Sequence, residues 1–209
     1  MNIWQKYFWG LILLTKQFIL ASASPRRLML LKKLLIEPQV IITEAVEQTG
    51  GTPAELVCAN AETKARAAAA QINGDYLVMG ADTVVSIERK ILGKPSNKKD
   101  ARRMLQFLSG RKHSVYSGIC LIDTKSGQVV CDYSRTVVTF RYLTEEMLNL
   151  YLSTDEPLDK AGAYAIQGMG SLLIDKINGD YGTVVGFSAP LLHELMQQLK
   201  LSIADFVIS

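Results

Sequence analysis

Residues 19–35 read ILASASPRRLMLLKKLL and predict a short strand that leads directly into a helix. Residues 18–22 are apolar and suit a buried strand. Ser24 then has the position of a helix N-cap, with Pro25 at the first helical site. Leucines follow at helical spacing, so one face of this helix is expected to pack on a sheet. They are Leu28, Leu31, Leu34 and Leu35.

Two arginines, Arg26 and Arg27, fall in the first turn of this predicted helix. A helix N-terminus carries unsatisfied N–H groups and a partial positive charge, so a cation there opposes the dipole. A bound anion would neutralise both side chains. A polyphosphate suits them because each guanidinium can grip phosphate oxygens bidentately. Two solvated surface arginines are the alternative, and this stretch alone leaves both interpretations open.

Length and composition are those of a single globular domain. The chain has 209 residues, of which 48% are hydrophobic and 21% charged, and its formal net charge is +3. This charge is too small to require nucleic acid as a partner, and no repeat or long run of one sign is present. We therefore expect a small anionic ligand, with neither stable nucleic-acid binding nor a membrane.

The three cysteines, Cys58, Cys120 and Cys131, are odd in number and show no CxxC spacing. We therefore expect neither a disulfide framework nor a zinc site, and we expect a reducing compartment. The two histidines, His113 and His193, are too few for a histidine-based metal site or a Ser/His triad. Both are expected to be surface or packing residues.

Residues 1–17, MNIWQKYFWGLILLTKQ, differ in character from the remainder. The apolar stretch at 7–14 is too short to span a bilayer, which takes about 20 residues. A signal peptide is the rival interpretation, because ASA at 21–23 resembles a signal-peptidase site. Cleavage after Ala23 would, however, remove the predicted first strand. We favour a cytoplasmic protein with an N-terminal extension, such as one produced by an early start codon.

The rest of the chain alternates strand and helix patterns. Thr52 and Glu55 form a capping box before an alanine-rich helix, and YLVMGADTVVSI at 76–87 is the strongest strand candidate. The expected elements are strands at 39–43, 76–87 and 171–177, a β-hairpin within 114–142, and helices at 53–70, 97–108, 145–153 and 189–200. Together they predict an α/β fold with a mixed, mostly twisted β-sheet flanked by helices.

Six motifs, taken in order, resemble the signature of the Maf family of nucleoside triphosphate pyrophosphatases. They are LASASPRRLMLL at 20–31, AETKARA at 61–67, GADTVV at 80–85, GKP at 93–95, LSGRKHSVYSGICLI at 108–122 and DEPLDKAGAYAIQG at 155–168. The last is similar to the dTTP/UTP branch of the family. The resemblance implies one Maf-like domain at 18–209, similar to the inosine triphosphatase fold, with a β-hairpin subregion and a cleft between two lobes.

The activity that this resemblance implies is hydrolysis of dTTP and UTP, and of modified pyrimidine nucleotides, to the monophosphate and pyrophosphate. Asp82 is implied to accept the proton of the attacking water, with a structural Asp in a local turn as the alternative. Glu47 and Asp82 are implied to hold a divalent cation, Mg²⁺ or Mn²⁺.

The implied phosphate-binding residues are mainly cationic. Arg26 and Arg27 would hold phosphate oxygens, and Lys64 and Lys94 would add point charges. For each lysine, a solvated surface charge is the alternative. Ser22 is implied either to complete the cation shell or to bond a phosphate.

The implied base-binding residues are an amide and a hydroxyl. Gln167 carries both a donor and an acceptor, which suits the edge of uracil or thymine, where N3–H lies between two carbonyls. Thr83 and the arginine pair, Arg26 and Arg27, are implied to share in discrimination between bases. Asp159 and Lys160 are expected to order their loop through a salt bridge, with a phosphate contact by Lys160 as the alternative.

Two positions depart from the family pattern. Ala165 stands where a glycine is common before the Ile-Gln pair, which would be unfavourable if that position needs a positive φ. Val46 stands where a first carboxylate often precedes Glu47. These departures bear on pocket shape and cation affinity more than on the class of reaction.

A second hypothesis is a cell division or septum formation regulator that acts by binding nucleic acid or protein, since family members have been linked to division arrest. It would require a basic stripe, yet the lysine pairs at 32–33 and 98–99 lie on different predicted elements. A homodimer is compatible with the resemblance, but no spacing in the sequence proves one.

Overall fold

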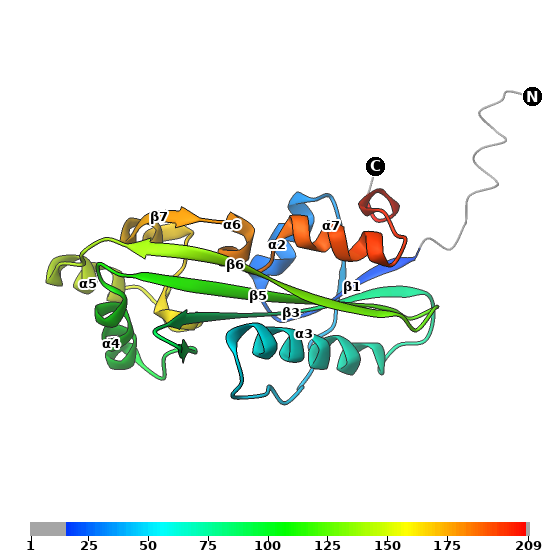
Figure 1. The fold of residues 1–209 in the computed structure, drawn as a ribbon, viewed down its shortest axis with the longest axis horizontal. Helices are drawn as coiled ribbons and strands as arrows, with labels where there is room; N and C mark the ends of the chain where they lie inside the picture. Colours follow the sequence, from blue (N-terminus) through cyan, green and yellow to red (C-terminus); the bar gives the residue numbers. More distant parts are fainter. Residues whose placement is uncertain (1–15, 208–209) are drawn as a thin grey trace, which may run out of the picture.

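The computed structural model describes residues 16–207, which form a seven-stranded mixed sheet with helices on both faces (Figure 1). The strand order is β2-β1-β3-β5-β6-β7, and β4 pairs with β3. β1 is parallel to both β2 and β3, and the remaining pairs are antiparallel. The strands are β1 (Gln17–Ala21), β2 (Gln39–Val40), β3 (Tyr76–Ile87), β4 (Lys90–Leu92), β5 (Lys112–Asp123), β6 (Val129–Phe140) and β7 (Ile174–Asn178). The predicted α/β class is confirmed.

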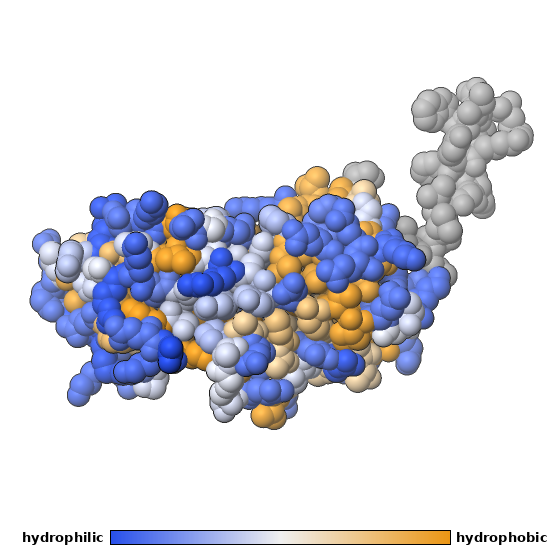
Figure 2. Space-filling view, in the orientation of Figure 1, coloured by the Kyte–Doolittle hydropathy of each residue, from blue (hydrophilic) through white to orange (hydrophobic). Residues whose placement is uncertain are grey.

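The helices form layers around the long strands β3, β5 and β6. In Figure 1, α3 lies along one face, α2 and α7 cover the other, and α4 and α5 gather at the far end of the strands. The helices are α2 (Pro25–Lys33), α3 (Pro53–Ala69), α4 (Lys98–Leu108), α5 (Glu145–Leu152), α6 (Tyr181–Val185) and α7 (Ala189–Gln198), with 3-10 turns η1 (Ala161–Ala163), η2 (Gly168–Leu173) and η3 (Ile203–Asp205). Hydrophobic colour in Figure 2 gathers over the half that holds α3 and α7, where two of the core clusters lie.

Most predicted elements are present, with three local differences. The capping box of α3 and the full length of β3 are confirmed. The strand expected at 39–43 is only two residues long. The segment 171–173 belongs to η2 rather than to the strand that follows it. Helix α6 was not predicted; its N-cap is Asp180, whose side chain accepts the N–H of Thr183.

One edge of β3 is left open in the middle. β1 pairs with this edge up to Gly80, where Ala21 is its last partner, and β4 pairs with it again from Val85 onward. Between them, within the described chain, residues 81–84 have no strand neighbour on that edge, because β5 occupies the opposite one. Successive side chains of a strand point to opposite faces, so this gap exposes groups from both sides of the sheet.

Helix α3 approaches the sheet closely at Gly80 of β3. A Cβ at Gly80 would lie 2.0 Å from the carbonyl oxygen of Ala61, which is backbone and cannot move aside without shifting the helix. The same holds on β5, where a Cβ at Gly118 would lie 2.5 Å from the backbone of Val57. Glycine at these positions lets α3 sit low on the sheet. This places the side chains of α3 beside the open edge of β3.

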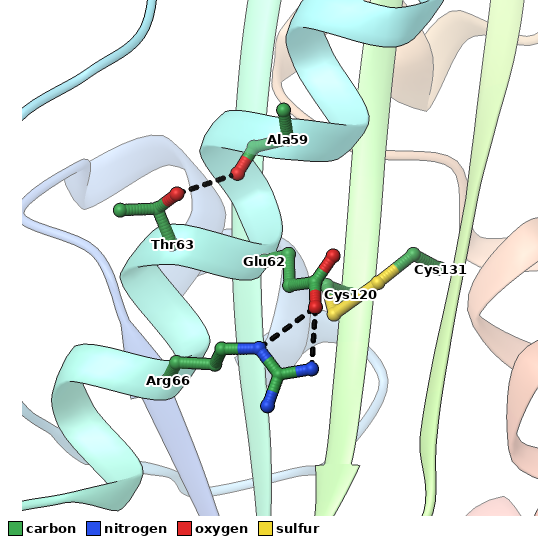
Figure 3. Close-up of a disulfide and its surroundings, with 6 residues drawn as sticks. All are labelled: Ala59, Glu62, Thr63, Arg66, Cys120 and Cys131. Carbon is green, nitrogen blue, oxygen red and sulfur yellow. Dashed lines mark hydrogen bonds and ion pairs between the residues drawn. A yellow bond between two sulfur atoms is a disulfide. The ribbon is translucent and has the colours of Figure 1, made fainter.

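The expectation of no disulfide was wrong, because Cys120 and Cys131 are bonded (Figure 3). They face one another across β5 and β6, with Cα atoms 4.1 Å apart, and pack beneath α3. Counting cysteines and looking for CxxC motifs cannot reveal a cross-strand pair that only the hairpin register brings together. Cys58 is free. The argument from cysteine usage to a reducing compartment therefore does not hold.

The predicted N-terminal extension at 1–17 lies almost entirely outside the described residues. Only Lys16 and Gln17 are described, and Lys16 pairs with Asp75 and Asp123 where β1 and β3 begin and β5 ends. Among residues 16–207, no helix has the length and apolar character that a membrane crossing demands.

We expect Gly80→Ala to lower the free energy of unfolding by about 1–3 kcal/mol or more, since the added methyl group overpacks a rigid backbone contact. Urea denaturation of both proteins measures this change. Gly93→Ala is the matched control, because its Cβ would meet no atom within 4 Å, and its effect should stay within about 1 kcal/mol. Equal urea midpoints of unfolding for Gly80→Ala and wild type would contradict the packing argument.

Candidate active site

A cavity of about 840 Å³ opens at the gap in the edge of β3. It is bordered by the end of β1, the start of α2, the side of α3, and the loops around Glu47, Lys94 and Gln167. All the residues predicted for the site line it: Ser22, Arg26, Arg27, Glu47, Lys64, Asp82, Thr83, Lys94 and Gln167. Residues spread over about 145 positions of sequence therefore meet around one space.

Asp82 lines this cavity and is only 8% exposed. Its Oδ1 accepts a hydrogen bond from Nζ of Lys64 at 2.7 Å, and its Oδ2 accepts one from Nδ2 of Asn60 at 3.3 Å. Asn60 and Lys64 are one turn apart on α3, so they reach the carboxylate from the same helix face. The orientation of Asp82 is thus set by α3.

Lys64 also pairs with a second carboxylate. Its Nζ lies 2.7 Å from Oε1 of Glu47, on the loop before α3. Burial alone would raise the pKa of Glu47, but the hydrogen bond and charge of Lys64, together with Lys94 and Arg27, hold that pKa below its ordinary value. Glu47 is therefore ionised at neutral pH, and two carboxylates converge on one ammonium group.

Asn60 is a residue of this site that the sequence did not reveal. Its side chain is 3% exposed, accepts the N–H of Gln48 at 2.7 Å and donates to the carbonyl of Gln48 at 3.4 Å. It therefore ties the loop that carries Glu47 to Asp82. A polar residue inside the apolar face of an alanine-rich helix was the available signal, because a buried amide needs partners.

Arg27 is buried at the opposite side of the gap. Its guanidinium donates to the carbonyl of Gly186 at 3.1 Å, to Oγ of Ser22 at 3.0 Å and to Oγ1 of Thr83 at 3.1 Å. Burial lowers the pKa of Arg27, while the carboxylate of Asp82 acts in the opposite direction. Three of its N–H groups thus join the end of β1, β3 and the segment after α6, and its other two make no hydrogen bond to the described residues.

Arg26 points to a different part of the cavity wall. Its Nη1 lies 3.3 Å from Oδ2 of Asp159, which also pairs with Lys160. The salt bridge expected between Asp159 and Lys160 is therefore present. The ion pair of Arg26 links the first turn of α2 to the loop that carries Gln167.

The remaining predicted residues are Lys94, Gln167 and Thr83. Lys94 is exposed in the loop after β4, and Gln167 is half-buried at the N-cap of η2. Thr83 Oγ1 faces the α2 side of the sheet, where it contacts Arg27, the carbonyl of Gly186 and Oγ of Ser117. Its hydroxyl is thus part of the network that holds Arg27.

The structure shows the backbone conformation of Ala165 and the exposure of Val46, the two residues that depart from the family pattern. Ala165 is not among the described residues with a positive φ, so an alanine fits there without backbone strain. Val46 is 86% exposed and contributes no acidic group to the site. The carboxylates that line the cavity are therefore Glu47, Asp82 and Asp159, of which Asp159 pairs with Arg26 and Lys160.

The pair formed by Glu47 and Asp82 fits a divalent cation held in the manner of Mg²⁺. No group of three or more potential ligands from His, Cys, Asp and Glu occurs among residues 16–207. Mg²⁺ commonly takes only one or two protein carboxylates and completes its shell with water and substrate phosphates. The convergence of both carboxylates on Lys64 shows that they can reach one cationic centre.

Comparisons with known proteins identify the family to which this chain belongs. A dTTP/UTP pyrophosphatase of Bacillus cereus strain G9842 is 47% identical over 185 residues, which cover 87% of this chain and 95% of the relative. One of Bacillus anthracis is 44% identical over 190 residues, 90% of this chain and 98% of that one. Among solved structures, the Staphylococcus aureus Ham1 protein is a distant likeness, with 16% identity, a TM-score of 0.48 and coverage of 92% and 94%. A family model described as Maf-like protein matches residues 17–199, and the chain therefore belongs to the Maf family.

Proposed function

We propose that this chain is a nucleoside triphosphate pyrophosphatase that hydrolyses dTTP and UTP to the monophosphate and pyrophosphate. The observation that carries the proposal is the position of Asp82, a buried carboxylate in a cavity whose walls hold Arg26, Arg27 and Lys94. The name shared by relatives at 44–47% identity supports the same substrates.

The start of α2 provides a site for the triphosphate. Ser24 occupies the N-cap, yet its side chain makes no capping hydrogen bond, and the first turn contains no acidic residue. The N–H groups of this turn therefore remain for an anion. Arg26 and Arg27 add guanidinium groups beside them, and Lys94 adds a cation from the opposite rim.

We assign to Asp82 the proton of the attacking water. Each of its carboxylate oxygens already accepts one hydrogen bond, from Lys64 and from Asn60, and each keeps a further lone pair. A water that donates to Asp82 from the cavity would be held against the α-phosphorus of a triphosphate bound at α2. In our proposal Asp82 acts as the general base and Lys64 restrains its carboxylate.

A divalent cation, Mg²⁺ or Mn²⁺, would be held by Glu47 and Asp82 together with phosphate oxygens. Bound there, it would shield negative charge on the phosphates and favour ionisation of the attacking water. The protein's own contribution is to hold the two carboxylates near one another, which Lys64 does by pairing with each. Ser22, held by Arg27, lines the same cavity.

Selection of the base is assigned to Gln167 at the rim of the cavity. Its amide can donate to a carbonyl and accept from N3–H of uracil or thymine. Cytosine presents an acceptor at N3 and an amino group beside it, so the same amide orientation would not serve it equally.

The enzyme hypothesis has support that the regulatory one lacks. The relatives compared with this chain carry the name of an enzyme, and the cavity gathers acidic and cationic groups suited to phosphate chemistry.

Asp82→Asn should lower kcat for dTTP by about 10²–10⁴-fold, because an amide cannot accept the proton of the attacking water. Pyrophosphate release in the presence of Mg²⁺ or Mn²⁺ measures the loss, and the melting temperature reports on the fold. Asp175→Asn, at an exposed carboxylate, is the control and should match wild type. Release of single orthophosphate by wild type would show that another bond is cut.

Gln167→Ala should reduce the preference for dTTP over dCTP, measured as the ratio of kcat/KM values, by about tenfold, while kcat for dTTP changes less. The reason is that the amide reads the base and does not touch the phosphates in our proposal. Gln128→Ala, at an exposed site in the β5–β6 turn, is the control. Equal losses on both nucleotides would remove Gln167 from base recognition.

A further inference from the structure

Gln167 lies at the tip of a short loop whose two ends touch. A Cβ at Gly170 would lie 2.2 Å from the carbonyl oxygen of Ala165, so the backbone at these two positions is in direct contact. Only glycine permits so close an approach at Gly170. The four residues between the ends project from this closed base, and the position of Gln167 depends on how the base is held.

Glu156 holds one end of the loop. Its Oε2 accepts the N–H of Met169 at 3.1 Å, and its Oε1 accepts the N–H of Gly170 at 3.3 Å. A carboxylate that accepts two backbone N–H groups makes charge-assisted bonds, which are stronger than neutral ones. The side chain of Lys160 also donates to the carbonyl of Glu156 at 2.7 Å, which fixes the backbone at this position.

Tyr151, the penultimate residue of α5, holds the other end. Its side chain is 2% exposed, and its hydroxyl oxygen accepts the N–H of Ala165 at 3.3 Å. Burial and the nearby carboxylate of Glu156 raise the pKa of this phenol, so it is neutral at physiological pH. The two holding groups thus lie next to each other beneath the loop.

A second tyrosine, Tyr164, fixes the backbone just before the loop. The hydroxyl of Tyr164 is 2.7 Å from Nε2 of His113, and both side chains are buried. Burial lowers the pKa of His113 to about 4, so this contact involves a neutral imidazole at physiological pH. The backbone just before the loop is therefore fixed to β5.

We infer that Glu156 and Tyr151 are positioning residues for base selection, which act by fixing the loop that presents Gln167. The inference rests on the proposed function. Neither side chain lines the cavity, so neither is expected to touch the nucleotide. Their effect should appear in the ratio of kcat/KM for dTTP to kcat/KM for dCTP. Both nucleotides carry the same triphosphate, so contacts to the triphosphate cancel in this ratio.

Two variants test this inference. Glu156→Gln keeps the size of the side chain and removes one of its two acceptor oxygens, and Tyr151→Phe removes only the hydroxyl. Asp155→Asn is the matched control, because Asp155 is next to Glu156 in the chain but its side chain is 93% exposed. We expect each test variant to lower the dTTP-to-dCTP ratio of kcat/KM by about tenfold, with kcat for dTTP reduced less, and the control to match wild type.

Hydrogen–deuterium exchange of peptides covering 159–170 provides a readout independent of activity. The amides of Ala165, Met169 and Gly170 should exchange at least about tenfold faster in the variant that removes their acceptor, while peptides of β3 and α3 stay unchanged. If Glu156→Gln does not fold, as its melting curve would show, Tyr151→Phe decides the matter.

Unchanged selectivity and unchanged exchange in a folded Tyr151→Phe protein would overturn the positioning role. Equal loss of activity on both nucleotides would also overturn it, since that would indicate general disturbance of the site. If wild type releases no pyrophosphate from dTTP or UTP, the proposed function itself is wrong, and this inference falls with it.

Discussion

The gap in the edge of β3 is the constraint on which the site depends. Because β3 pairs with β1 only up to Gly80 and with β4 only from Val85, neighbouring residues of β3 with opposite orientations open onto one cavity. Asp82 faces α3 and meets Lys64, while Thr83 faces α2 and meets Arg27. A continuous strand neighbour at 81–84 would separate these two groups by a layer of backbone. The interruption brings acidic and cationic groups from both faces of the sheet to one space.

Burial of charge at this gap is tolerated because each charged group has partners. Arg27 loses most of its water but donates to three oxygen acceptors, and Asp82 accepts from both a cation and an amide. Removing one partner from such a set leaves a buried charge without compensation. This commonly lowers the free energy of unfolding by several kcal/mol. The ammonium of Lys64 holds two carboxylates together where their mutual repulsion would otherwise separate them. The site is therefore preorganised by its own ion pairs.

Local patterns in the sequence predicted most of the regular structure, because their causes are local. The capping box at Thr52 and the β-branched run of β3 specify their elements without reference to distant residues. The disulfide and the role of Asn60 could not be predicted in this way, since each depends on register or on a loop folding back. Motif resemblance, by contrast, named residues that the fold brings around one cavity, although it could not show that Lys64 joins two carboxylates.

The groups assigned to phosphate chemistry lie mainly on helices and strands, whereas the group assigned to base selection lies on a loop. The groups assigned to phosphate and proton transfer come mainly from β3, α2 and α3, whose positions are fixed by the sheet and its close-packed helix. The group assigned to the base comes from a loop that is held by Glu156 and Tyr151 through backbone N–H groups rather than side chains. Hydrogen bonds to backbone N–H groups do not depend on which side chains the loop carries. Side chains at its tip can therefore change without loss of its support, and base preference can vary while the phosphate chemistry is retained.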